Sequence, residues 1–214
     1  MERLLYEFPH GRPAYSPLVN EIEFAPHTEL WQNNNKTEAL YGGDIEYAVS
    51  RKFILEAGIS KLTNESQLPA FIHESGLELG AYYTYLNNSH YVITLGLESQ
   101  FQLDKENNDN NKASLEPMIL AAVALDKFQI HAGISAEISS LVKPGFFIAG
   151  IYHLGFIRPF IEVDNPNEKT NTFMITPGLV IPFYEDFHCG IGFPFANSKA
   201  GLTLFVAIEL GDEE

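Results

Sequence analysis

Residues 173–195 read FMITPGLVIPFYEDFHCGIGFPF. Large apolar residues stand at alternate positions, the pattern breaks at YEDF, and the alternation then resumes. Successive side chains of a β-strand point to opposite faces, so a period of two predicts a strand on each side of the break. This stretch therefore predicts a hairpin with one apolar face and a short turn.

The same alternation recurs along most of the chain and predicts about twelve strands of about ten residues each. Within each segment the apolar residues share one parity and include no charge, as at Ile119 and Val123 or at Leu204 and Ile208. The opposite faces carry glutamate, threonine, glutamine and histidine. The polar faces include Glu23, Glu46, Glu56, Glu98, Glu116, Glu137, His131 and Arg158.

The connections between the segments alternate between long and short. Long connections such as QNNNK, SSLVKPG and ANSKAG alternate with short ones such as SR, NNSH and DK. An even strand number, uncharged outer faces and loops that are long on one rim only are typical of outer-membrane barrels. The sequence predicts an all-β, antiparallel, transmembrane up-and-down β-barrel of about twelve strands, with short periplasmic turns and long extracellular loops. The alternative is a soluble periplasmic β-barrel whose apolar faces enclose an apolar ligand.

Composition excludes several classes of protein. The net charge of −15, from 28 acidic and 13 basic residues, argues against nucleic-acid binding because no basic surface can replace phosphate counterions. The longest apolar run, residues 117–125, is too short for a membrane-spanning helix. A single cysteine, Cys189, excludes an intramolecular disulfide and a multi-cysteine zinc site.

The expected organisation is one barrel domain with short flanking segments. Residues 1–17 are interpreted as a periplasmic or plug-like segment, residues 18–211 as the barrel and residues 212–214 as an acidic tail. No secretory signal is visible in MERLLYEFPHGRP, so export would require that a signal has been removed. Aromatic residues near strand ends predict girdles at the membrane interfaces. The expected girdle residues are Trp31, Tyr41, Phe53, Tyr85, Tyr91, Phe101, Phe128, Phe146, Phe183, Phe187 and Phe195.

Both ends of the chain carry a family resemblance. TPGLVIPF, followed after a short turn by CGIGFPFANSKAGLTLFVAIEL, resembles the carboxy-terminal hairpins of bacterial outer-membrane transporters named for the MetA pathway of phenol degradation. The amino-terminal YEFPHGRPAYSPLVNEIEFAPH is similar to the leading segment of that family. The resemblance implies a barrel in the outer membrane of Gram-negative bacteria, with a role in moving small, aromatic or hydrophobic solutes. It supplies no catalytic motif and no cofactor.

The acidic faces suggest how such a barrel selects its solutes. Carboxylates around a water-filled pore attract cations and repel anions. The hypothesis is a narrow, cation-preferring lumen lined by Glu23, Glu46, Glu56, Glu98, Glu116 and Glu137, with Arg158 as a counter-charge and His131 as a hydrogen-bonding residue, not a metal ligand. Closely packed carboxylates that share protons would instead form a plug, so a closed structural barrel is the alternative.

The loop LTNESQLPAFIHESG is long and contains three apolar residues, Leu68, Phe71 and Ile72. We expect it to act as a lid or constriction; an amphipathic element lying on the rim is the alternative. No G-x-S-x-G motif and no Ser/His pair on an outer face occurs, which predicts that the protein is not an enzyme. The expected partners are outer-membrane lipid, lipopolysaccharide and a small-molecule solute, with no cofactor and no metal.

Overall fold

The computed structural model describes residues 19–33, 36–62, 76–88, 90–102, 113–165, 173–184, 186–196 and 199–211. All regular structure in these residues is β-strand. The strands are β1 (Ile22–Asn33), β2 (Lys36–Ser50), β3 (Phe53–Leu62), β4 (Gly76–Asn87), β5 (Tyr91–Gln102), β6 (Ala113–Leu125), β7 (Phe128–Ile138), β8 (Val142–Tyr152), β9 (Arg158–Asn165), β10 (Met174–Tyr184), β11 (Phe187–Gly192), β12 (Phe195–Ala196) and β13 (Lys199–Leu210).

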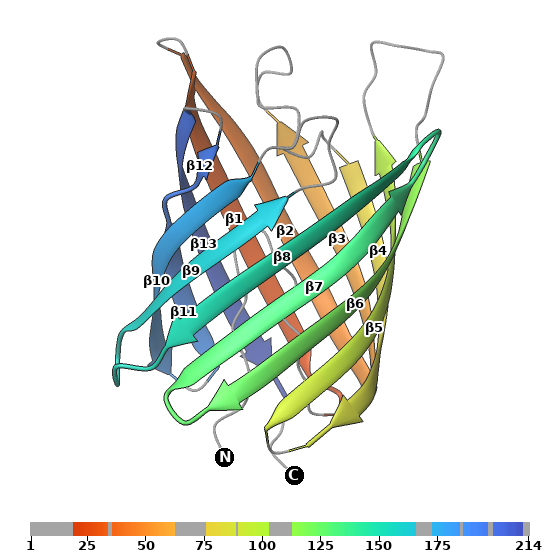
Figure 1. Cartoon of the computed structure of the whole chain (residues 1–214), viewed down its shortest axis with the longest axis vertical. Helices are drawn as coiled ribbons and strands as arrows, with labels where there is room; N and C mark the ends of the chain where they lie inside the picture. The colour runs from red at the N-terminus through yellow and green to blue at the C-terminus, as the bar shows by residue number, and fades with distance from the viewer. Residues whose placement is uncertain are drawn as a thin grey trace.

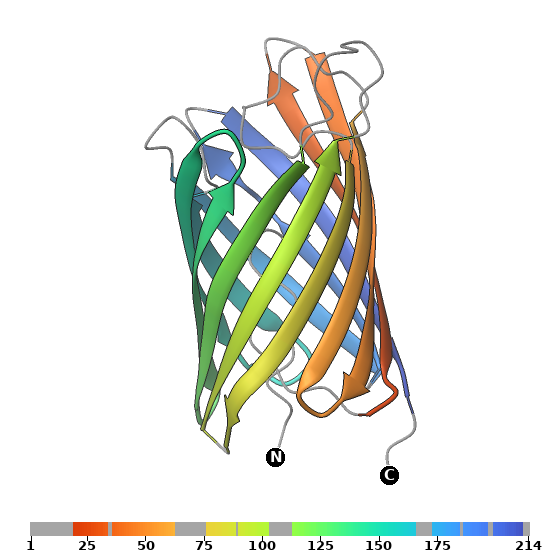
Figure 2. The same cartoon turned by 90° about the vertical axis from the view of Figure 1, so that its right-hand side faces the viewer.

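The strands form a closed antiparallel barrel (Figures 1 and 2). From β1 to β11 each strand pairs with the next one in the sequence, β11 pairs with β13, and β13 closes the ring by pairing with β1 from Ile22–Leu210 to Trp31–Gly201. β11 and β12 both lie between β10 and β13 and are two parts of one strand, interrupted at Phe193 and Pro194. Proline has no N–H to give to a ladder, which accounts for the break. The barrel therefore has twelve strands, and the predicted fold is confirmed.

The outer face of the barrel is apolar and exposed. Ile119, Leu204 and Ile148 are 48%, 45% and 53% exposed, while the residues that alternate with them are buried. The soluble alternative required the opposite arrangement, with these side chains inside, and that prediction is wrong. No helix in the described part of the chain is long and apolar enough to cross a membrane.

Short turns gather at one end of the barrel, which we call the turn rim; the opposite end is the loop rim. Arg51 and Lys52 join β2 to β3, and Asp126 and Lys127 join β6 to β7. Asp126 has a φ of 53°, a left-handed conformation that aspartate tolerates better than most residues. β1 begins and β13 ends at the turn rim, as the Ile22–Leu210 pairing requires.

Three of the predicted long connections are wrong. QNNNK, SSLVKPG and ANSKAG are mostly strand, so only residues 34–35, 139–141 and 197–198 remain between the strands. Longer intervals at the loop rim separate β3 from β4, β5 from β6 and β9 from β10. The polar residues of the shorter connections extend the strands because ladder pairing uses backbone groups and tolerates any side chain that water can solvate.

Most of the expected girdle aromatics are exposed near strand ends, with Tyr41, Tyr85 and Phe183 at 50%, 67% and 57%. Trp31 is the exception and its assignment was wrong. It shares the parity of Glu29 and lies fully buried on the inner face. Its position close to a strand end was therefore a poorer guide than its parity.

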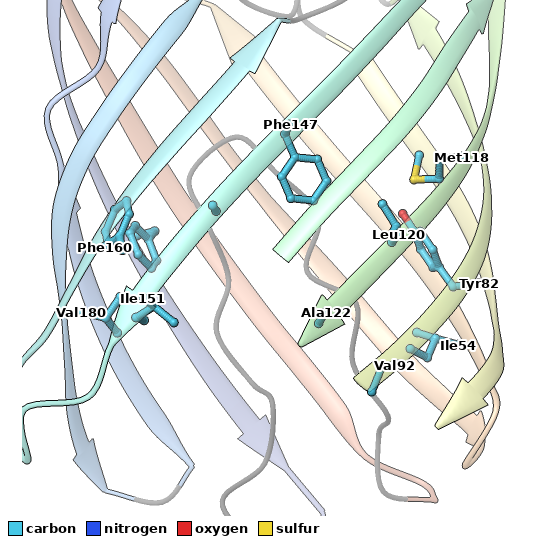
Figure 3. Packing of buried hydrophobic residues seen from close by; sticks show 12 residues of the cluster. Ile54, Tyr82, Val92, Met118, Leu120, Ala122, Phe147, Ile151, Phe160 and Val180 are labelled. Carbon is cyan, nitrogen blue, oxygen red and sulfur yellow. The ribbon is translucent and has the colours of Figure 1, made fainter. Parts of the chain in front are cut away.

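The inner face also carries an apolar cluster that the expected polar lumen did not include (Figure 3). On β8 the inward side chains Phe147, Ala149 and Ile151 are all apolar. The rings of Phe160 on β9 and Phe205 on β13 pack edge to face, with centroids 6.3 Å apart. The cluster comprises Ile54, Tyr82, Val92, Met118, Leu120, Ala122, Phe147, Ala149, Ile151, Phe160, Val180 and Phe205.

Several expectations concern residues outside those the structure describes. They are the segment 1–17, the acidic tail 212–214 and the lid residues Leu68, Phe71 and Ile72. The domain boundaries and the lid therefore remain predictions.

Candidate functional site

Six inward-facing glutamates form one row across seven neighbouring strands, and we call this row the carboxylate ladder. Each pair of adjacent positions in the row is a directly opposed cross-strand pair, and only one position has no side chain. The members, in order around the wall, are Glu209 on β13, Glu23 on β1, Glu46 on β2, Glu56 on β3, Gly80 on β4, Glu98 on β5 and Glu116 on β6.

The ladder climbs the wall as it passes around it. Glu23 is the second residue of β1 and Glu98 is the eighth residue of β5, and both strands begin at the turn rim. Glu116 is the fourth residue of β6, which begins at the loop rim. Because barrel strands are tilted, a row at right angles to them is a spiral. The ladder therefore connects the neighbourhoods of both rims.

The carboxylates are shielded from bulk water. Glu23, Glu56 and Glu98 are 6%, 4% and 5% exposed, and Glu116 is half-buried. Other inward side chains, including His131, Ile151 and Glu162, are fully buried. The interior is therefore closely packed around the ladder.

Tyr82 fills the gap in the ladder at Gly80. Its hydroxyl donates a hydrogen bond to Glu98 Oε1. A Cβ at Gly80 would lie 2.9 Å from Tyr82 Cε2, and one at Gly96 would lie 2.8 Å from Tyr82 Cδ1. The ring thus occupies the space that two glycines leave on the inner face.

Two groups of three carboxylates are close enough to share a cation. Oxygens of Glu21, Glu23 and Glu209 lie within 4.8 Å of one another near the turn rim. At the same end, His188 Nε2 lies 3.6 Å from Glu209 Oε1. Carboxylate groups at this spacing suit cations because each oxygen accepts and none donates when ionised.

The second group lies further along the ladder and consists of Glu56, Glu78 and Glu98, with oxygens again within 4.8 Å. Glu78 belongs to the adjacent row and accepts a hydrogen bond of 3.3 Å from Gln100 Nε2. Neighbouring carboxylates repel one another, so a cation or shared protons must offset the repulsion.

Glu137 continues the direction of the ladder but has a basic partner. The β6–β7 pairings Leu115–Ile138 and Met118–Ser135 place Glu137 opposite Glu116. Its Oε2 lies 3.0 Å from Lys143 Nζ on β8. The charge of Glu137 is therefore locally compensated, and its expected part in cation selectivity stays a prediction.

His131 and Arg158 lie on strands outside the ladder. His131, on β7, is fully buried between Ala122 and Ala149, with Nε2 3.4 Å from Gln129 Oε1. The lumenal role expected for His131 stays a prediction. Arg158 is the first residue of β9 and is half-buried near the turn rim.

Sequence reasoning missed Glu209 and Tyr82 as members of the site. Glu209 stood on a polar face but belongs to the ladder only because β13 closes on β1. Tyr82 shares the parity of Glu78 and Thr84, which was a usable signal. Of the expected residues, the structure brings Glu23, Glu46, Glu56, Glu98 and Glu116 into one row.

No known protein-family model matches the chain, and no curated protein matches it. The resemblance to the MetA-pathway family is therefore not confirmed. Solved structures do match. The KdgM porin has a TM-score of 0.67 at 10% identity, covering 88% of this chain and 99% of the porin.

Two further channels have the same fold. The COG4313 outer membrane channel from Pseudomonas putida F1 has a TM-score of 0.64 at 13% identity, over 95% of this chain and all of that one. The NanC porin has a TM-score of 0.63 at 6% identity, over 87% of this chain and all of that one. The fold is that of outer-membrane porin-like barrels.

Proposed function

We propose that the protein is a passive channel of the bacterial outer membrane that admits small solutes through an acidic, cation-preferring lumen. One observation carries the proposal: the carboxylate ladder runs from the turn rim to the loop rim on the inside of a closed barrel. Successive carboxylates along a path attract cations and repel anions. The apolar outer face and the fold shared with porins support a place in the outer membrane, with lipid and lipopolysaccharide around it.

The test is conductance and ion selectivity of the full chain in planar bilayers under a KCl gradient. Folding is checked first by heat-modifiable migration on a denaturing gel. For the wild type, the reversal potential is expected to be shifted from zero towards the equilibrium potential of potassium. In the triple variant Glu23→Gln, Glu46→Gln, Glu56→Gln it is expected to move towards zero, because three charges of the ladder are removed.

Asp126→Asn is the matched control for this experiment, since Asp126 is exposed in a turn. Its reversal potential should equal that of the wild type. A wild-type reversal potential shifted towards the equilibrium potential of chloride would refute the cation-preferring lumen. A triple variant with wild-type selectivity would refute the assignment to the ladder.

A closed structural barrel is the second candidate, and the close packing of the interior favours it. His131, Ile151 and Glu162 are fully buried although they face the lumen. If the barrel is closed, the protein is expected to fold into a heat-modifiable barrel that inserts into bilayers and carries no current. A single-channel current from the wild type would exclude it.

Membership of the MetA-pathway family remains part of the proposal. The quoted carboxy-terminal stretch corresponds to β10, β11, β12 and β13. A solute with an aromatic or hydrophobic part, as the resemblance implies, suits the apolar inner side chains Phe147, Phe160 and Phe205. The sequence contains no G-x-S-x-G motif, and we propose no enzymatic activity for the protein.

A further inference from the structure

Two carboxyl groups from strands far apart in the sequence interact electrostatically inside the barrel, away from the ladder. Asp164 is the penultimate residue of β9, and Glu29 lies in the half of β1 nearer the loop rim. Their carboxyl groups are near enough to interact electrostatically. Both side chains are buried, at 4% and 5% exposure. The pair therefore places two buried carboxyl groups within the lumen, close to the loop rim.

Asp164 lacks the hydrogen bonds that a buried carboxylate requires. Among the described residues, no donor reaches either of its two oxygens. A buried charge without hydrogen bonds or a counter-charge is strongly destabilising, and a second carboxylate nearby increases the penalty. Binding a cation would offset both effects, so the arrangement is complementary to a positively charged ligand.

Two hydroxyl groups around the pair also have acceptor oxygens to offer. Thr203 on β13 is the direct cross-strand partner of Glu29. Thr176 on β10 is diagonal to Asp164, whose direct partner is Met174. Both threonines are fully buried, and neither hydroxyl has a hydrogen-bond partner among the described residues. An ammonium group has three N–H donors to share among such acceptors.

An aromatic and apolar surface lies beside the carboxylates. Trp31 donates a hydrogen bond from Nε1 to Glu29 Oε2 at 3.1 Å. The indole packs in one cluster with Leu40, Met174 and Ala196. The face of an indole attracts cations, and the apolar neighbours suit a hydrocarbon body. An inorganic cation would use the oxygens but leave this surface unused.

We infer that Asp164, Glu29 and Trp31 form a binding site for an organic ammonium ion, a primary amine carried on an aromatic or apolar body. The inference rests on the proposed channel function and names a class of solute for it. Lys199, a basic residue at the start of β13, is half-buried at the same end of the barrel.

Trp31 allows a direct binding test because it is the single tryptophan of the chain. The full chain is purified in detergent, and Trp31 emission is followed while benzylammonium chloride is added. A saturable change is expected. Benzyl alcohol, which has the same ring and no charge, is expected to bind at least about tenfold more weakly because it cannot pair with the carboxylates. Equal titrations for the two compounds would overturn the inference.

Asp164→Asn tests the residue directly, with Asp126→Asn as the matched control at an exposed turn. Benzylammonium affinity should fall about tenfold or more in Asp164→Asn and stay at the wild-type value in Asp126→Asn. Unchanged affinity in a heat-modifiable Asp164→Asn barrel would also overturn the inference. If Asp164→Asn does not fold, the comparison of benzylammonium with benzyl alcohol on the wild type decides alone.

The binding measurement in detergent is independent of transport. Binding without conductance would refute the channel while leaving the ammonium site in place. Conductance without binding would refute the site while leaving the channel. Where both occur, benzylammonium is expected to reduce the potassium current of the wild type and to have a weaker effect on Asp164→Asn.

Discussion

The hydroxyl of Tyr82 on β4 donates a hydrogen bond to the carboxylate of Glu98 on β5, and the Tyr82 ring lies over Gly80, the position at which the carboxylate ladder lacks a side chain. A ladder that continued through β4 would place a glutamate between Glu56 and Glu98. Instead, a neutral donor reaches one of the two flanking carboxylates. Tyr82 therefore stabilises one of the two carboxylates that flank the gap in the ladder.

Tyr82→Phe removes this donor and keeps the ring. We expect the free energy of unfolding to fall by about 1–3 kcal/mol, because a buried carboxylate loses a hydrogen bond. Urea unfolding in detergent micelles measures the change. Tyr83→Phe is the control, since Tyr83 is on the outer face and 44% exposed. An equal effect in both variants would contradict the role of the Tyr82 hydroxyl.

Gly80→Ala tests the space that the ring occupies. The new Cβ would lie 2.9 Å from Tyr82 Cε2 and 3.2 Å from Glu56 Cβ, so the ring must move. Overpacking of this kind costs about 1–3 kcal/mol in the free energy of unfolding. In Gly43→Ala the nearest atom, Pro26 Cα, is 3.4 Å away, an ordinary contact. The control should unfold like the wild type; destabilisation of Gly43→Ala by the same amount would refute the argument.

Strand parity together with the absence of charge on one face allowed the outer face to be predicted. Ile119 and Leu204 alternate with residues of a different kind, and a period of two leaves only two assignments of faces. The absence of charge on one face then decided which side meets lipid. The apolar inner cluster was not predicted because the inner faces were assigned as polar from their charged and polar residues, and their apolar residues were left out of account. The stretch FFIAGIY, apolar at both parities, was the available signal on β8.

The ladder and the Asp164–Glu29 pair were beyond prediction for a different reason. Parity fixes the face of a residue, whereas a row across strands also requires the register of each pair. Glu209 is opposite Glu23 only because the barrel closes, and Glu29 interacts electrostatically with Asp164 although β1 and β9 are far apart in the sequence. Neither relationship is encoded in a local pattern. For Trp31 the local pattern was sufficient: its parity indicates the inner face, whereas its position near a strand end led to the wrong assignment to the outer girdle.

Ile119→Lys tests the position of the barrel in the membrane. Ile119 is central in β6 and faces outward, whereas Leu125 ends the same strand at the turn rim. A lysine at the bilayer midplane of a barrel costs about 2–4 kcal/mol, and near an interface about 0–1 kcal/mol. Ile119→Lys should therefore be much less stable in phospholipid vesicles than Leu125→Lys, as measured by the folded fraction on unheated gels. Equal stability of the two variants would mean that lipid does not surround β6.

Phe205→Ala tests whether the inner apolar cluster limits conduction. Phe205 packs against Phe160, covers Gly190 and is 5% exposed. Removing the ring leaves a cavity that is expected to lower the free energy of unfolding by about 3–5 kcal/mol. Apolar constrictions also exclude water from pores, so the same change should raise the single-channel conductance above that of the wild type. Phe193→Ala, which removes an outward ring that is 43% exposed, should leave conductance unchanged. A folded Phe205→Ala barrel with wild-type conductance would show that the solute path does not pass this cluster, and the conduction pathway would then have to follow the carboxylate ladder alone.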